Sequence, residues 1–440
     1  AVINPVDPLA VLQSISKDQL HFYFERSHHP ILQSEADRVS IAAIGDAIQF
    51  QVNGEQRFFL AQQFVNSCLK DMVVAGDDNL PFAGPHFFGS FTFFPQATDP
   101  TSPFSATTLF LPRWQICRQN DRSILVANRV IDATQNLESL VRELEEGSQA
   151  ICAIGSLLPP RRIYRSPLFH QQDIRDESHF KSAVQTVLTS IQNQDLDKVV
   201  LAHALDVTAP LPFDLIASLH NLRQFYPDCY IFSTGNGRGQ HFMGASPERL
   251  LSVHDRELVV DALAGSAPRG RTHTHDVELA KRLISSDKER REHRAVSDFI
   301  CHCLTRLGFT PQCAAIPHLL RLSNIQHLRT VIRSETIASI HPLEIVAALH
   351  PTPAVAGVSR DLACQHIRQS EGFDRALYAS PLGWLDHRGN CEFIVGIRSA
   401  LLDGCHARLY AGAGIVAGSD ADRELAEVRL KLQTLLAALV

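Results

Sequence analysis

Residues 229–265, CYIFSTGNGRGQHFMGASPERLLSVHDRELVVDALAG, contain four strand-like segments in succession. The segments are rich in apolar, β-branched and aromatic residues, and the connections between them are short and hold Gly, Asn, Asp and Pro. Short turns join antiparallel neighbours, whereas parallel strands need long crossovers. The stretch therefore predicts an antiparallel sheet. Its GNGRG segment (235–239) is a hairpin turn, because no G-x-G-x-x-G follows a strand and opens a helix there.

Similar patterns extend to both sides of this stretch. Strand patterns recur at 39–52, 86–94, 107–119, 122–130, 198–207, 391–402 and 406–416. Helical spacing of apolar residues is found at 58–76, 137–147, 180–191, 274–308, 342–350, 359–371 and 421–439. The two kinds of segment do not alternate regularly, as they would in a doubly wound sheet. We therefore expect the α+β class, with large, mostly antiparallel sheets and helices packed outside.

The chain has 440 residues, 45% of them hydrophobic and 20% charged, a composition typical of a folded protein with a large core. No Gly/Ser-rich or Pro-rich repeat separates independent domains. Pro159, Pro160 and Pro167 mark a boundary region. We expect two interwoven halves, an N-terminal α+β half at 1–170 that is integrated with the core and a catalytic half at 171–440.

Charge and apolar pattern exclude several classes of protein. The formal net charge of −6 gives no basic footprint for nucleic acid, and no apolar run reaches the roughly 18 to 20 residues of a membrane span. The first residues hold neither a basic start nor a signal-type apolar core. Ten irregularly spaced cysteines indicate reduced thiols, and Cys301, His302 and Cys303 lack the spacing of a zinc site. Without a heptad pattern, a cytoplasmic monomer is expected.

Two pairs of glutamates carry the first chemical signal. Glu289 and Glu292 lie in one predicted helix, and Glu424 and Glu427 lie in the last one, each pair at i, i+3. This spacing puts both carboxylates of a pair on one helical face. Where two such faces converge, their oxygens can hold a hard divalent cation beside an anionic substrate. The pattern predicts Mg²⁺-dependent chemistry.

Lys198, Glu248 and Arg398 are each ambiguous alone. Lys198 begins an apolar strand, where a desolvated amine can act as a base and a solvated one is only a strand end. Glu248 can be an acid or the polar start of a strand. Arg398 lies within an apolar segment, where an arginine needs an anionic partner.

Residues of a loop and of the last predicted helix are also ambiguous when each is taken alone. Gly265 and Ser266 can form an anion-binding loop or a capped turn. Lys431 shares a helical face with Glu424 and Glu427, either as part of a site or as a solvated ion pair.

A series of short sequence words, in a fixed order along the chain, makes this set of candidate residues specific for one family. They are GASPERL (244–250), LAGSAPRG (263–270), KERREHRAV (288–296), NIQHL (324–328), HPTPAVAG (350–357), YASPLGW (378–384), GIRSALL (396–402), LYAGAGIV (409–416) and RELAEVRLK (423–431). With them, residues 175–440 closely resemble the chorismate-utilising enzymes, which include isochorismate synthase, salicylate synthase, anthranilate synthase component I and aminodeoxychorismate synthase. FFGSFTF (87–93) and FLPRW (110–114) resemble the N-terminal half of the family more loosely.

The resemblance implies isomerisation of chorismate to isochorismate. A lysine at position 198, in KVVLA, marks the members that add water rather than ammonia, so no glutaminase subunit is expected. Lys198 would deprotonate a water that attacks C2 of the ring, and Glu248 would protonate the departing C4 hydroxyl. The implied cofactor is Mg²⁺, held by Glu292 and Glu427, with Glu289 and Glu424 acting directly or through bound water.

The resemblance also implies how chorismate is held. At the ring carboxylate, the implied contacts are Gly265, Ser266 and Lys431. At the enolpyruvyl carboxylate they are Arg398 and Tyr378, with the Gly412 and Gly414 backbone close by. His327 matches a family histidine near the reacting ring. Ser266 replaces the usual threonine but keeps a hydroxyl, and we assign no role to His203 from the sequence.

Three alternatives stay open. Salicylate synthase shares the base, acid and metal residues and then eliminates pyruvate from isochorismate. Anthranilate or aminodeoxychorismate synthase is disfavoured by Lys198, and a non-catalytic chorismate-binding protein is disfavoured because no predicted catalytic or metal residue is missing. The long region before Lys198 resembles the enzymes of menaquinone or phylloquinone biosynthesis more than the compact siderophore versions.

Overall fold

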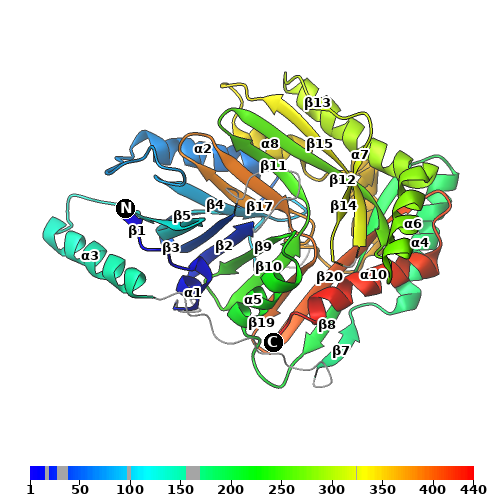
Figure 1. Cartoon of the computed structure of the whole chain (residues 1–440), viewed down its shortest axis with the longest axis horizontal. Coiled ribbons are helices and arrows are strands. Elements are labelled where there is room, and N and C mark those ends of the chain that lie inside the picture. Colours follow the sequence, from blue (N-terminus) through cyan, green and yellow to red (C-terminus); the bar gives the residue numbers. More distant parts are fainter. Residues whose placement is uncertain (15–18, 27–37, 97–100, 155–168, 324) are drawn as a thin grey trace.

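A computed structural model describes residues 1–14, 19–26, 38–96, 101–154, 169–323 and 325–440. The predicted boundary at Pro159, Pro160 and Pro167 lies outside the described residues, as does Asn324 of NIQHL. The described strands belong to one continuous sheet that folds back on itself, with helices around it (Figure 1). The prediction of an α+β fold with large antiparallel sheets is confirmed.

The sheet can be followed as a ribbon from one wall of the molecule to the other. Its main strands pair antiparallel in the order β8 (Lys198–Thr208), β20 (His406–Val416), β19 (Ser399–Asp403), β10 (Gln240–Ser246), β9 (Tyr230–Asn236), β2 (Leu20–Arg26), β3 (Val39–Val52), β5 (Thr107–Gln119), β4 (His86–Phe91), β17 (Pro381–Asp386), β18 (Cys391–Val395), β11 (Arg249–His254), β12 (Glu257–Pro268) and β15 (Ile325–Glu335). N-terminal strands thus form its middle, and the pairings β2–β9 and β4–β17 cross the expected boundary near residue 170.

Short strands extend this ribbon. They are β1 (Val2–Ile3) on β6 (Arg122–Ala127), which pairs with β5; β7 (His170–Asp173) and β16 (Gly357–Val358) on β8; and β13 (Gln312–Cys313) and β14 (His318–Arg321) on β15. The β9–β10 pairing confirms the hairpin turn predicted at 235–239, and β5 and β6 form a further hairpin around Asn120 and Asp121.

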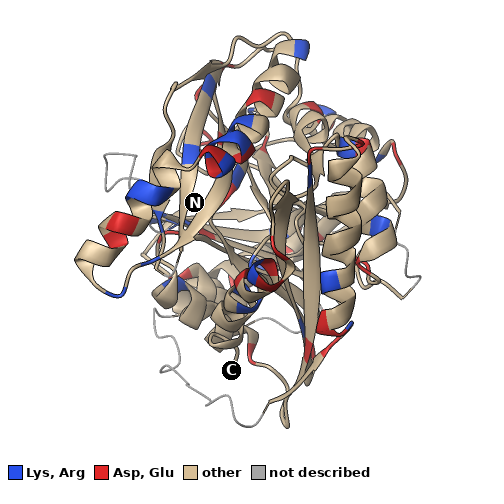
Figure 2. Ribbon diagram, turned by 90° about the vertical axis from the view of Figure 1, so that its right-hand side faces the viewer, with Lys and Arg blue, Asp and Glu red and all other residues tan. Residues whose placement is uncertain are grey.

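Helices cover the sheet from outside. They are α1 (Pro8–Gln13), α2 (Arg57–Lys70), α3 (Leu137–Ala153), α4 (Glu177–Gln192), α5 (Leu215–Phe225), α6 (His273–Ser285), α7 (Asp287–Arg306), α8 (Pro342–Leu349), α9 (Arg360–Ser370) and α10 (Ala421–Leu436). Positions occupied by charged residues of both signs lie along several of the helices, as Figure 2 shows. Among the described residues, the helices are too short or too polar to cross a membrane.

Some of the predicted boundaries were wrong. The helix expected at 274–308 is two helices, because the Ser286 side chain accepts a hydrogen bond from the Glu289 amide and starts α7 anew. The strand expected at 391–402 is interrupted between β18 and β19, where Arg398 adopts a left-handed backbone with φ of 50°. The helix expected at 58–76 ends at Lys70, and the strand expected to reach residue 130 ends at Ala127.

Two helices bring the glutamate pairs to the sheet. The α7 helix packs against β12 and β15, and α10 packs against β20 and α4. Each pair lies within the first two turns of its helix, where the helix dipole favours negative charge. The two ends of the ribbon thereby carry one acidic pair each.

Candidate active site

A cavity of about 260 Å³ lies between the two ends of the sheet. Thirteen of the fourteen residues predicted from the sequence line it, namely Glu248, Gly265, Ser266, Glu289, Glu292, His327, Tyr378, Arg398, Gly412, Gly414, Glu424, Glu427 and Lys431. They come from β12, β15, β20, α7, α10 and the segments before β11, β17 and β19. Residues far apart in the sequence therefore meet in one polar cavity.

Lys198 stands directly behind the cavity wall. Its side chain is 3% exposed, and its Nζ lies 2.8 Å from Glu292 Oε1. Gly414 makes room for this pair, because a Cβ there would lie 2.9 Å from Glu292 Oε1 and 3.1 Å from Lys198 Cε. The ion pair joins β8 to α7 at the edge of the cavity.

The strand that carries Lys198 is held by a buried ion pair that the sequence did not reveal. Glu371 Oε1 accepts a hydrogen bond from the Ala202 amide at 2.7 Å, and Arg375 Nη2 donates to the Val200 carbonyl at 2.8 Å. Glu371 and Arg375 also pair with each other and are buried. They replace a neighbouring strand along this part of β8.

Glu248 is a buried carboxyl with an unusual protonation equilibrium. Burial, together with the negative charge of Asp261, raises the pKa of Glu248 to about 8, and Lys198 opposes the shift. Asp261 is buried and ion-paired to Arg249 at 3.0 Å and to Arg329 at 2.7 Å. Glu248 is therefore mostly a neutral acid at pH 7, which suits proton donation.

The four glutamates of the cavity are partnered by three lysines. The ion pairs are Glu292–Lys198 at 2.8 Å, Glu427–Lys431 at 2.7 Å, Glu424–Lys288 at 3.7 Å and Glu289–Lys288 at 4.0 Å. In the part of the chain that is described, no three His, Cys, Asp or Glu side chains are grouped closely enough to hold a metal ion. The acidic helix faces converge on the cavity, with cations between the carboxylates.

The glutamates respond differently to this environment. Burial, and then the charge of Glu292, raises the pKa of Glu289. Burial also raises the pKa of Glu424. For Glu427, burial alone would raise the pKa, but the Lys431 ammonium outweighs it, and the net shift is downward. Negative charge at the cavity is thus only partly neutralised by the lysines.

The opposite part of the cavity presents donors to an anion. Arg398 Nη2 lies 3.0 Å from His327 Nε2, and His327 Nδ1 lies 3.0 Å from Ser266 Oγ. Tyr378 is buried and stacks on Tyr410 with ring centroids 5.3 Å apart. Lys431 Nζ, besides pairing with Glu427, donates to a backbone carbonyl of β20 at 2.8 Å. Several cationic or neutral donors therefore face the space that an anionic ligand would fill.

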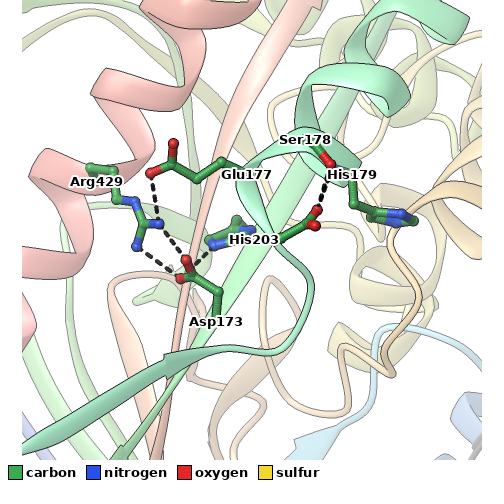
Figure 3. Close-up of polar contacts among 7 residues, drawn as sticks. Asp173, Glu177, Ser178, His179, His203 and Arg429 are labelled. Atoms are coloured by element: carbon green, nitrogen blue, oxygen red, sulfur yellow. Dashed lines mark hydrogen bonds and ion pairs between the residues drawn. The ribbon is translucent and has the colours of Figure 1, made fainter.

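The structure gives His203 a physical account. Its Nε2 lies 2.9 Å from Asp173 Oδ1, and Arg429 of α10 binds the same carboxylate with both Nη atoms, as Figure 3 shows. Arg429 also donates to Glu177 of α4 at 3.0 Å. Asp173 thereby joins β8, which carries Lys198, to α10, which carries Glu424 and Glu427.

Sequence reasoning missed several residues of the cavity wall. Lys288, Arg423 and Tyr410 line the cavity beside the predicted set. Each lies inside a sequence word of the family resemblance, one or two residues from a residue that was singled out. Their position in those words was the available signal. Asp261 gave no such signal, because a buried aspartate in a strand is recognised only when its arginine partners are known.

Comparisons with known proteins identify the family of the chain. A family model described as "Chorismate binding enzyme" matches residues 1–440. The chain is 32% identical to the salicylate biosynthesis isochorismate synthase of Pseudomonas aeruginosa, over 99% of this chain and 88% of that protein. It is 31% identical to the isochorismate synthase MenF of Bacillus subtilis, over 81% of this chain and 75% of that protein.

Solved structures show the same relationship. The menaquinone-specific isochorismate synthase MenF of Escherichia coli has a TM-score of 0.78 and 28% identity, over 99% of this chain and 94% of that chain. Anthranilate synthase component I of Streptococcus pneumoniae, at 20% identity and a TM-score of 0.75, shares the fold, over 98% of this chain and 97% of that chain. The chain therefore belongs to the chorismate-binding enzymes, and within them it is an enzyme of the isochorismate synthase family.

Proposed function

We propose that this protein catalyses the Mg²⁺-dependent isomerisation of chorismate to isochorismate, by addition of water at C2 and loss of the C4 hydroxyl. The observation that carries the proposal is that a buried lysine and a buried neutral acid are both found at one cavity. Lys198 is 2% exposed and Glu248 is 4% exposed, and the pKa of Glu248 is raised to about 8 by its burial. Water addition with loss of hydroxide requires both a base and an acid.

Each residue has one role in the proposed reaction. Lys198, as the neutral amine, accepts a proton from the water that attacks C2. Glu248, as the neutral acid, donates its proton to the C4 hydroxyl as it leaves and the ring double bonds shift. Arg398 and Tyr378 hold the enolpyruvyl carboxylate beside the backbone of Gly412 and Gly414. Arg398 and Tyr378 are buried, which strengthens their interaction with a carboxylate.

The donor set at the cavity fits a hard divalent cation. Four carboxylates supply only oxygen, which Mg²⁺ prefers. Burial raises the pKa values of Glu289 and Glu424, so negative charge there is not fully compensated. Glu292 and Glu427 would hold the ion, with Glu289 and Glu424 acting directly or through water, and bound Mg²⁺ supplies positive charge for the ring carboxylate of the substrate.

Ser266, Gly265 and Lys431 complete the binding of the ring carboxylate. Glu292 is both the close partner of Lys198 and a proposed metal ligand, so a bound cation would compete with Lys198 for the same negative charge. Binding of the ion and release of Lys198 are therefore linked in this proposal. Water, not ammonia, is the nucleophile, so the enzyme works without a glutaminase subunit, and we propose that it does so as a monomer.

For the pathway, we propose quinone biosynthesis. The menaquinone-specific structure, with a TM-score of 0.78 over 99% of this chain, supports this assignment, and the salicylate relative, which also aligns with 99% of the chain, is the alternative. Disruption of the gene in its own host tests this point, and loss of menaquinone or phylloquinone is expected. Unchanged quinone levels would favour salicylate formation, the role named for the Pseudomonas aeruginosa relative.

Product analysis tests the reaction itself. The purified protein is incubated with chorismate and Mg²⁺, with and without EDTA, and the products are separated by chromatography. Metal-dependent isochorismate in reversible balance with chorismate is expected, and added ammonium or glutamine should not change the product. Salicylate with pyruvate would identify a salicylate synthase, and binding of chorismate without any product would identify a non-catalytic binding protein.

A further inference from the structure

Three polar side chains form a row along the cavity wall, which we name the Arg398–His327–Ser266 row. Arg398 Nη2 lies 3.0 Å from His327 Nε2, and His327 Nδ1 lies 3.0 Å from Ser266 Oγ. All three residues line the cavity. Ser266 and His327 are directly opposite each other in the β12–β15 pairing. Both ring nitrogens of His327 are therefore engaged by protein groups.

The partners of His327 determine which nitrogen carries its proton. A guanidinium only donates hydrogen bonds, so Nε2 must accept from Arg398 with its lone pair. A neutral imidazole then carries its proton on Nδ1. The Gly265 carbonyl, which can only accept, also faces this imidazole. Burial, with the positive charges of Arg398 and Lys431, lowers the pKa of His327 and keeps the ring neutral.

This arrangement fixes the direction of the Ser266 hydroxyl. A serine hydroxyl has one proton to donate and two lone pairs to accept with. Because the Nδ1–H of His327 points toward Ser266 Oγ, the hydroxyl proton cannot point back at the imidazole. The Ser266 amide is already used, since it donates to Glu289 Oε2 at 3.1 Å. The hydroxyl proton is left for a group inside the cavity.

We propose that His327 is a positioning residue, held by Arg398 as the neutral Nδ1–H tautomer, and that it turns the Ser266 hydroxyl to donate its proton to an anionic oxygen of the substrate. The identity of that oxygen, a carboxylate of chorismate, rests on the proposed function. The tautomer of His327 and the direction of the Ser266 hydroxyl do not depend on the proposed function. In this arrangement His327 has neither a free lone pair nor a proton for the ring chemistry.

The tautomer can be observed directly, without turnover. The full-length, metal-free protein is labelled with ¹⁵N in its histidine rings, and two-bond ¹H–¹⁵N correlations are recorded between about pH 6 and pH 8. The His327 signals are those lost in His327→Gln or, where that variant does not fold, those shifted by Ser266→Ala. A protonated Nδ1, an unprotonated Nε2 and no titration are expected. An Nε2–H tautomer or a titrating ring would overturn the proposal.

Kinetics test what the hydroxyl does. Ser266→Ala should raise the KM for chorismate about tenfold, because a charge-assisted hydrogen bond is lost, with a smaller effect on kcat. Ser266→Thr, which restores a hydroxyl, should recover most of that loss. The control is Ser182→Ala, on the exposed side of α4. An unchanged KM in Ser266→Ala, or no recovery in Ser266→Thr, would show that the hydroxyl does not donate to the substrate.

A double-mutant cycle tests whether His327 acts through Ser266. His327→Gln combined with Ser266→Ala should raise KM little more than Ser266→Ala alone, because both changes remove the same hydrogen bond. Fully additive effects would mean that His327 contacts the substrate independently, contrary to the proposal. If the protein proves to form no isochorismate, chorismate affinities measured by calorimetry replace KM in the same cycle. The role proposed for His327 can therefore be refuted independently of the proposed function.

Discussion

Replacing Glu248 by glutamine should inactivate the enzyme and stabilise it at once. In the folded protein, burial and then the charge of Asp261 raise the pKa of Glu248 to about 8, from the ordinary value of 4.5. An amide has nearly the shape of a protonated carboxyl group but has no proton to lose. Glu248→Gln therefore removes the acid while avoiding the free-energy cost of burying a carboxyl that ionises readily in the unfolded chain.

The size and sign of the effect follow from proton linkage. Above pH 4.5 the unfolded chain loses the Glu248 proton while the folded protein keeps it up to about pH 8. The folded state then binds more protons, so this group lowers the free energy of unfolding as pH rises. At about 1.4 kcal/mol for each pKa unit, the loss is about 3 kcal/mol at pH 7 and levels off near about 5 kcal/mol above pH 8.

Urea unfolding of the metal-free protein tests this reasoning. The difference in free energy of unfolding between Glu248→Gln and wild type should grow by several kcal/mol from about pH 5 to about pH 9. Isochorismate formation by the variant should fall at least about a hundredfold. The matched control is Glu145→Gln, an exposed residue of α3. A stability difference that does not change with pH would show that Glu248 is not held protonated.

Other variants test the remaining parts of the site. Lys198→Met keeps an apolar stem of similar length but no amine, so turnover should fall at least about a hundredfold; near-normal turnover would exclude Lys198 as the base. Glu427→Gln removes one ligand charge, and the Mg²⁺ concentration for half-maximal rate should rise about tenfold, whereas an unchanged titration would exclude it as a ligand. Asp173→Asn weakens the joint between β8 and α10 and should lower the free energy of unfolding by about 1 to 3 kcal/mol in urea. The exposed pair Asp422–Lys181 offers the control, since Asp422→Asn should cost less than about 1 kcal/mol; equal losses would mean that Asp173 is an ordinary surface partner.

Local patterns were sufficient for the architecture. Apolar alternation and short polar turns predicted β9 to β12 and β20, because each strand buries one side or both and each hairpin needs turn residues. The predicted boundaries were wrong where one residue determines where a helix or strand begins or ends. Ser286 starts a new helix, and the signal was present as a serine three residues before Glu289. The left-handed backbone of Arg398 had no local signal, because arginine rarely adopts it.

The site was predictable as a set of residues but not as a network. The sequence words named nearly all of the cavity wall because they preserve the order of a known family. The contact of Lys198 with Glu292 could not be foreseen, since it joins β8 to α7 across the folded sheet. The same limit applies to Asp261, whose charge acts on Glu248 only after the strands have paired.

The course of the sheet has a consequence for biosynthesis. Its middle is made of N-terminal strands, while the end that carries Lys198 is completed only by β20 and α10, the last elements of the chain. During synthesis the early strands must wait for β9 and β17, and the cavity is incomplete until α10 has left the ribosome. Most pairings join distant segments, so folding is slow and nascent strand edges stay open to aggregation. Chorismate cannot stabilise such a partial chain, because its binding site is the last part of the molecule to form.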